Sequence, residues 1–186
     1  MPIKQQAFSV IELVIAISII AILTTIVMAN FHDANKSKSV QLGADAIASA
    51  FRTAQENSLN PKEISAISCS QGKVPGEYHL IFNITQPTIF TLTAKDKCGN
   101  PGIVLQTFNL PKNVVINTVG GLKIDGAAVA SPLDFKFETP FAKATISSGS
   151  AVFRSFTQGE VVLAFNDGSF TRHIILDGLS GRVDIQ

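Results

Sequence analysis

An acidic side chain stands at the head of an uncharged, apolar run near the N-terminus. The acid is Glu12, and no charged residue occurs between Leu13 and Phe31. A carboxylate at the end of a membrane span costs on the order of a few kcal/mol unless it is paired, so Glu12 is predicted to have a functional partner. Hydrolysis of the bond between Ala7 and Phe8 would create that partner, a free ammonium group. Phe8 and Glu12 are four residues apart and share one helix face, so the pair can form within one chain or between neighbouring chains.

The element that must position Glu12 is the apolar run itself. Its polar interruptions are few, namely Ser18, Thr24, Thr25 and Asn30. A helix of roughly 20 apolar residues crosses a hydrocarbon core about 30 Å thick. Such a helix also pairs its backbone groups internally, as lipid requires. The run is therefore predicted to be a membrane-spanning helix with one acid at its start.

These residues resemble the type III signal of type IV pilins and type II secretion pseudopilins. That signal joins a short polar leader, a small residue, Phe at the first mature position and Glu at the fifth. Ala7, Phe8 and Glu12 match in order, although Gly is the usual residue where this chain has Ala7. The resemblance implies that a prepilin peptidase cleaves after Ala7 and that Phe8 is N-methylated. It also implies that Glu12 serves assembly with other pilin or pseudopilin subunits, at an assembly platform in the inner membrane.

The apolar run also allows three interpretations that compete with this resemblance. Val27-Met28-Ala29 is similar to the cleavage site of a secretory signal peptide, but the apolar regions of such peptides run for about 7–15 residues without an acid. A plain signal anchor would leave Glu12 without a role. A buried core helix is disfavoured because the run is apolar on every face, which suits lipid better than one side of a domain.

The helix is predicted to continue beyond the membrane, as one element from Phe8 to Leu59. Apolar residues recur at alternating spacings of four and three, which marks an amphipathic stripe: Val40, Ala44, Ile47, Phe51 and Ala54. Asn60 precedes Pro61 and is thereby pushed out of the helical conformation, so the helix ends there. Gly43 is a weak point within it.

The chain is thus divided into four parts. They are a leader at 1–7, a transmembrane and filament-core helix at 8–31, an amphipathic continuation at 32–60 and an antiparallel β domain at 61–186. Lys4 and the amino terminus favour a cytoplasmic N-terminus under the positive-inside rule. The expected location is the bacterial inner membrane, which the chain crosses once, with the C-terminal domain in the periplasm or outside the cell in a filament.

From Ile64 onward the apolar periodicity changes to two, as in β-strands. Leu133, Phe135 and Phe137 alternate with charged residues, and Asp167-Gly168 between two apolar runs is a hairpin signal. A strand predicted from Tyr78 to Thr85 contains the sequon Asn83-Ile84-Thr85. An antiparallel sheet of this kind needs cover on one face, which the amphipathic half-helix can supply. The predicted fold class is α+β, a long N-terminal helix packed on an antiparallel β-sheet domain.

Two cysteines, Cys69 and Cys98, fall in the predicted β domain. On this topology both lie outside the cytosol, where an oxidising compartment permits a disulfide. We favour a Cys69–Cys98 bridge, with two buried free thiols as the alternative.

The C-terminal end carries a second, weaker resemblance. A strand, the Asn166-Asp167-Gly168 turn, another strand and a Gly-Arg ending are similar to the H-type minor pseudopilins of type II secretion and the FimT-like minor pilins. In part of that family a Gly-Arg-x-Arg ending is tied to DNA uptake. Gly181 and Arg182 match, but Asp184 replaces the second Arg, and an acid there opposes phosphate contact. Arg182 is a candidate nucleic-acid contact, yet a solvated strand-end residue is the favoured interpretation and nucleic acid is not expected as a partner.

Other chemistry has little support in the sequence. The 15 basic and 14 acidic residues give a net charge of +1, which provides no overall field for nucleic acid. His32, His79 and His173 lack the spacing of metal ligands, so neither a metal nor a cofactor is expected. No nucleophile is placed by a recognisable motif, and the chain is not expected to be an enzyme.

Two classes of function remain. The first is a structural subunit, a minor pilin or pseudopilin of the H-type or FimT-like kind, with a major pilin as the runner-up. The second is a membrane-anchored extracytoplasmic β domain that binds a ligand or DNA and never polymerises.

Overall fold

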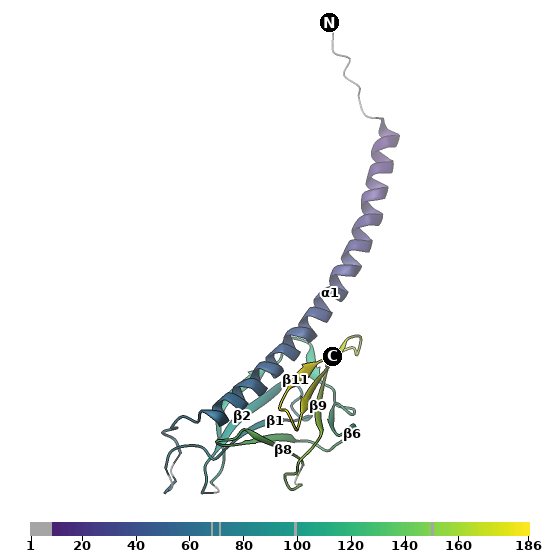
Figure 1. Cartoon of the computed structure of the whole chain (residues 1–186). Coiled ribbons are helices and arrows are strands. Elements are labelled where there is room, and N and C mark those ends of the chain that lie inside the picture. The colour runs from purple at the N-terminus through teal and green to yellow at the C-terminus, as the bar shows by residue number, and fades with distance from the viewer. Residues whose placement is uncertain (1–8, 68, 71, 99, 150) are drawn as a thin grey trace. The chain divides into compact units, whose positions relative to one another are not determined.

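The computed structural model describes residues 9–67, 69–70, 72–98, 100–149 and 151–186 (Figure 1). Its single long helix is α1 (Val10–Leu59). The strands in chain order are β1 (Glu77–Phe82), β2 (Ile89–Lys95), β3 (Ile103–Asn109), β4 (Val114–Ile116), β5 (Leu122–Ile124), β6 (Ala127–Ala128), β7 (Leu133–Glu138), β8 (Lys143–Ser148), β9 (Gln158–Phe165), β10 (Thr171–Asp177) and β11 (Val183–Ile185). One helix with antiparallel sheets is the α+β fold that the sequence predicts.

The chain divides into two units, Met1–Lys36 and Ser37–Gln186, and α1 contributes to both. Among the described residues, α1 is the one helix that is long and apolar enough to cross a membrane. It ends at Leu59, directly before Asn60 and Pro61, as predicted from the constraint that Pro places on the preceding residue. The predicted start, Phe8, lies outside the described residues.

The second unit buries the predicted stripe of α1. Val40, Ala44, Ile47, Phe51 and Ala54 have exposed fractions of 1% or less. Phe51 packs on the aromatic rings of the first sheet, with its ring centroid 4.8 Å from that of Phe135 and 5.8 Å from that of Phe82. The stripe therefore forms the helical side of the core, as its periodicity predicts.

The first sheet has five antiparallel strands in the order β3-β2-β1-β7-β8. Its core face carries the alternating apolar residues of the central strands, including Leu80, Phe82 and Phe135, which are fully buried. Alternation sends the intervening residues to the opposite face. The strand predicted from Tyr78 to Thr85 is too long, because β1 ends at Phe82 and Asn83 begins the following turn. The sequon is thus in a loop and not within a strand.

The second sheet has the order β11-β10-β9-β5-β6, with β4 also paired to β9. The predicted hairpin joins β9 to β10, and the Gly168 N–H donates to the Phe165 carbonyl across the turn. Gly43 of α1 approaches this sheet closely, since a β-carbon there would lie 3.1 Å from Leu163 Cδ1 and 3.3 Å from Val114 Cγ1. The glycine that weakens the isolated helix thus permits close packing of that helix on the sheet.

Candidate functional site

Glu12 lies in the first turn of α1, in a capping box with Ser9. The Ser9 N–H donates to Glu12 Oε2 at 3.1 Å, and Ser9 Oγ accepts from the Ile11 N–H at 3.3 Å. A Ser followed by Glu three residues later satisfies two backbone donors that the helix itself leaves unpaired. The N-terminal end of the helix dipole also favours a carboxylate at this place. The capping-box pattern is visible in the sequence as Ser9-Val10-Ile11-Glu12. Sequence reasoning that considers only a charged partner for Glu12 misses this capping role.

The cap occupies only part of the Glu12 carboxylate. Within the described residues Oε2 has a hydrogen-bond donor, whereas Oε1 has none. Glu12 is exposed, so that oxygen is accessible to a donor from outside the chain. Ala7 and Phe8, the predicted cleavage and methylation residues, lie outside the described residues.

The helix that follows Glu12 presents apolar side chains to its surroundings. Large exposed examples are Leu13, Ile17, Ile20, Leu23 and Val27. The hydroxyl groups in this segment bond within the helix: Ser18 Oγ donates to the Val14 carbonyl at 2.8 Å and Thr25 Oγ1 to that of Ile22 at 2.7 Å. Their polar atoms are satisfied without water, as a helix in lipid or in a bundle of helices requires. This part of α1 is therefore suited to an apolar environment.

Arg182, the candidate nucleic-acid contact, forms an ion pair with Asp184. Its Nε and Nη2 atoms lie 2.9 Å and 2.6 Å from Asp184 Oδ2. Asp184, which stands where the Gly-Arg-x-Arg ending has its second Arg, therefore offsets the charge of Arg182.

His173 and Asp177, which are close in the sequence, each have other partners in the structure. His173 Nδ1 lies beside Glu160 Oε1, and Lys123 Nζ is 3.0 Å from the same oxygen. Burial raises the pKa of Glu160, but hydrogen bonds from His173 and Lys123 outweigh burial and hold that pKa below its usual value. Asp177 accepts from the Leu179 and Ser180 N–H groups and organises its own loop. Both residues have local structural partners.

The structure joins Cys69 to Cys98, which ties the segment before β1 to the loop after β2. Their Cα atoms are 5.9 Å apart, and 29 residues separate the two positions in the sequence.

Removing this bridge is expected to destabilise the domain. Replacing both Cys69 and Cys98 with Ser should lower the free energy of unfolding by roughly 3–4 kcal/mol, because a loop of this length restricts the unfolded chain. Urea unfolding of the full chain in detergent, with and without a reductant, measures the effect. A reductant should lower the urea midpoint of the parent protein but not that of the double variant. An equal change in both midpoints would contradict the disulfide.

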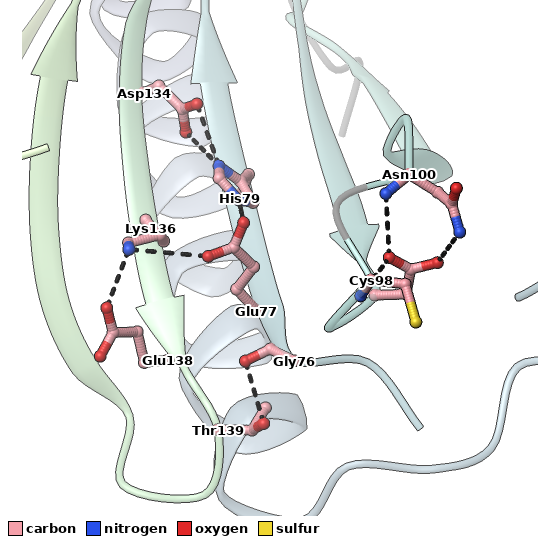
Figure 2. A network of polar contacts seen from close by, with 10 residues as sticks. Gly76, Glu77, His79, Cys98, Asn100, Asp134, Lys136, Glu138 and Thr139 are labelled. Atoms are coloured by element: carbon pink, nitrogen blue, oxygen red, sulfur yellow. Dashed lines mark hydrogen bonds and ion pairs between the residues drawn. The ribbon is translucent and has the colours of Figure 1, made fainter. Parts of the chain in front are cut away.

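A cluster of ionisable side chains lies on the face of β1 and β7 opposite the core (Figure 2). His79 is fully buried, and its Nδ1 atom is 3.0 Å from both carboxylate oxygens of Asp134. Its Nε2 atom is 3.0 Å from Glu77 Oε1. Lys136 Nζ lies 2.8 Å from Glu138 Oε1 and 3.6 Å from Glu77 Oε2. Two potential cations thus alternate with three carboxylates.

Phe153 covers this cluster. Its ring centroid is 5.5 Å from that of His79, and Lys136 Nζ lies 5.0 Å from the Phe153 ring. His79 has no exposed surface, so its ring contacts only its neighbours within the protein. No group of three or more His, Cys, Asp and Glu side chains that could hold a metal ion occurs in the part of the chain that the structure describes.

The contacts shift the protonation of the cluster towards its charged forms. Burial lowers the pKa of His79, but the hydrogen bond with Asp134 and the Glu77 carboxylate beside Nε2 outweigh burial and leave it raised. The close contact with His79 lowers the pKa of Glu77 despite partial burial. Burial also lowers the pKa of Lys136, and Glu138 and Glu77 more than compensate. The folded state therefore favours an imidazolium at His79.

Replacing His79 with Gln is expected to lower the free energy of unfolding by about 3 kcal/mol near pH 6, since it leaves the partly buried carboxylates of Asp134 and Glu77 short of a cation. The raised pKa means that the folded state binds a proton more tightly than the unfolded state. The stabilisation is therefore complete below about pH 6.5, the ordinary histidine pKa, and is lost as the pH rises through the folded value.

Urea unfolding of both proteins between about pH 5 and pH 9 tests this linkage. The difference in free energy of unfolding between the parent protein and His79→Gln should shrink as the pH rises. His32, which is exposed, provides the matched control His32→Gln, with an expected change within about 0.5 kcal/mol. A difference that is the same at every pH would rule out the charged form as its source.

Comparison with known proteins identifies the N-terminal segment. Residues 3–28 match the family model described as the prokaryotic N-terminal methylation motif. No curated protein and no solved structure matches the chain. The motif implies processing by a prepilin peptidase and assembly with other pilin subunits, and the apolar helix is consistent with a single-pass anchor in the inner membrane. Together these findings support a prepilin-type pilin or pseudopilin of the type IV pilin-like family.

Proposed function

We propose that this chain is a minor subunit of a type IV pilus or a type II secretion pseudopilus, most like the H-type and FimT-like subunits. In this proposal the peptidase cleaves after Ala7, Phe8 is N-methylated, and α1 carries the mature chain into a filament. The observation that supports it best is Glu12 at the head of the uncharged, apolar part of α1, inside the matched methylation motif.

Cleavage would change the electrostatics of the first turn. Before it, Glu12 Oε2 accepts from the Ser9 N–H and caps the helix. After it, a new ammonium group on an adjacent subunit can bind the other carboxylate oxygen. Such a pair is stronger in a low-dielectric surrounding than in water. It would set the axial register between subunits, and the apolar residues from Leu13 to Val27 would leave lipid to form the filament core.

The proposed topology places the N-terminus in the cytoplasm and the β domain in the periplasm or on the filament surface. The β domain would then determine the neighbouring subunits or the cargo. We do not propose DNA binding, because the Arg182 guanidinium is already paired with Asp184 and one offset cation gives little attraction for phosphate.

The test is recovery of the chain in filaments. Surface filaments sheared from cells that make the intact machine should contain this chain at a small fraction of the main subunit. Filaments that contain their other subunits but lack this chain, while the membrane fraction retains it in full, would favour an anchored β domain that does not polymerise. Recovery as the most abundant subunit would indicate a major pilin.

A further inference from the structure

A groove of about 420 Å³ lies where three separate segments meet: the end of α1, the turn after β7 and the loop between β10 and β11. Three large apolar side chains that line it are exposed, with fractions of 53% for Leu59, 83% for Phe141 and 89% for Leu179. Single exposed apolar residues are ordinary on protein surfaces, but three on one groove mark an interaction surface.

The groove is already formed in the single chain. Gln55 Nε2 donates to the Gly181 carbonyl at 2.6 Å and thereby joins α1 to the β10–β11 loop. The Gly178 N–H donates to the Thr157 carbonyl at 2.9 Å and fixes the other end of that loop. Because these hydrogen bonds fix the walls of the groove before a partner binds, binding would require little loss of conformational entropy in the groove.

One wall of the groove is an open strand edge. β8 is the last strand of its sheet, and Ile146 exchanges backbone hydrogen bonds with Arg154 at 2.9 Å and 3.0 Å on the side away from β7. Backbone groups alternate along an antiparallel strand with a period of two, so the N–H and C=O of Ala144 point the same way. Ala144 lines the groove, and among the described residues its N–H and C=O make no backbone hydrogen bond of this kind. An extended peptide can add to an edge of this kind as a further strand.

The charge at this edge selects the partner. Lys143 is exposed and is the charged side chain among the residues that line the groove. No described residue forms an ion pair with it, whereas the nearby Asp177 is bonded to its own loop. A carboxylate on the incoming strand would pair with Lys143, and apolar side chains beside it would contact Phe141 and Leu179.

We propose that this groove binds an extended, acidic and apolar segment of another pilin-type subunit, which adds to β8 at Ala144. The inference rests on the proposed function, because it names the kind of partner that the filament would supply. It predicts that the second unit takes part in subunit contacts of its own, in addition to those made by the helix.

Site-specific photocrosslinking in the full chain tests the proposal in cells that make the filament. A benzophenone-bearing phenylalanine analogue is placed at Phe141 or Leu179, and at Val119 or Val152 as controls with similar exposed fractions of 84% and 87%. Crosslinks from the two groove positions should join an extended, acid-containing segment of another pilin-type subunit, mapped by peptide mass spectrometry, with little product from the controls. Equal yields at all four positions, no product, or crosslinks only to lipid or to a helix would overturn the proposal.

Charge reversal separates this inference from the proposed function. Lys143→Glu should reduce recovery in sheared filaments roughly tenfold, through loss of an ion pair and gain of repulsion, whereas Lys112→Glu at another exposed lysine should not. If Glu12→Ala abolishes recovery and Lys143→Glu does not change it, the groove proposal alone fails. If neither variant changes recovery, the assembly role of Glu12 fails as well, and the filament role itself fails only if the parent chain is absent from filaments. Folding of each variant is checked by its unfolding midpoint in urea.

Discussion

Replacing Glu12 with Ala is expected to remove this chain from filaments without removing it from the membrane. In the proposed filament, the variant leaves the Phe8 ammonium group without its carboxylate in an apolar surrounding. An unpaired charge near the end of a span costs on the order of 2 kcal/mol, which corresponds to a roughly thirtyfold loss of incorporation. Glu12→Gln should behave in the same way, because it keeps the shape of the side chain and removes the charge.

Two controls separate the charge of Glu12 from its capping role. Ser9→Ala removes the hydroxyl that accepts the Ile11 N–H but leaves the carboxylate in place, so incorporation should fall only slightly. Glu56→Ala removes an exposed acid from the same helix and should have no effect. Immunoblots of sheared filaments and of membranes give, for each variant, the ratio of the amount in filaments to the amount in the membrane. Recovery of Glu12→Ala in filaments at the parental level would exclude the assembly role of this acid.

Replacing Phe51 with Ala should produce a large loss of stability in the second unit. The Phe51 ring has an exposed fraction of 1% and contacts the rings of Phe82, Phe135 and Phe137. Its removal leaves a cavity between α1 and the first sheet, which is expected to lower the free energy of unfolding by about 3–5 kcal/mol. Urea unfolding of the full chain in detergent measures the change.

Leu42 lies on the same helix but is 53% exposed, and it provides the control. Leu42→Ala should change the free energy of unfolding by no more than about 0.5 kcal/mol. A loss below about 1 kcal/mol for Phe51→Ala would mean that α1 does not pack on the sheet through this stripe.

Local rules predicted the features that depend on neighbouring residues. Asn60 before Pro61 predicted the end of α1, and Asp167-Gly168 predicted the hairpin between β9 and β10. The spacing of Val40 and Phe51 predicted the buried face of the helix. Each of these features depends on backbone conformation or periodicity within a few residues, so it can be predicted from the local sequence.

Features that depend on distant residues could not be predicted in this way. His79 and Asp134 are 55 residues apart in the sequence, and only the pairing of β1 with β7 brings them together. The division of the strands into two sheets depends on such pairings as well. Helix propensity marks Gly43 as a weak point of α1. The packing that requires a glycine there involves Val114 and Leu163, which belong to distant strands, so the sequence around Gly43 does not reveal it. The strand predicted as far as Thr85 was too long because apolar alternation continues past Phe82 into a turn.

The intact mass and N-terminal sequence of the protein from its native membrane, with and without the prepilin peptidase, distinguish a processed pilin-type subunit from a secreted or anchored domain. We expect a mature chain that begins at Phe8 and carries one added methyl group, and an uncut chain when the peptidase is absent. A chain that begins at Asn30 in both strains would instead indicate an ordinary secreted domain, and every role assigned to Glu12 would be wrong. An uncut chain in both strains would contradict processing and favour an anchored β domain.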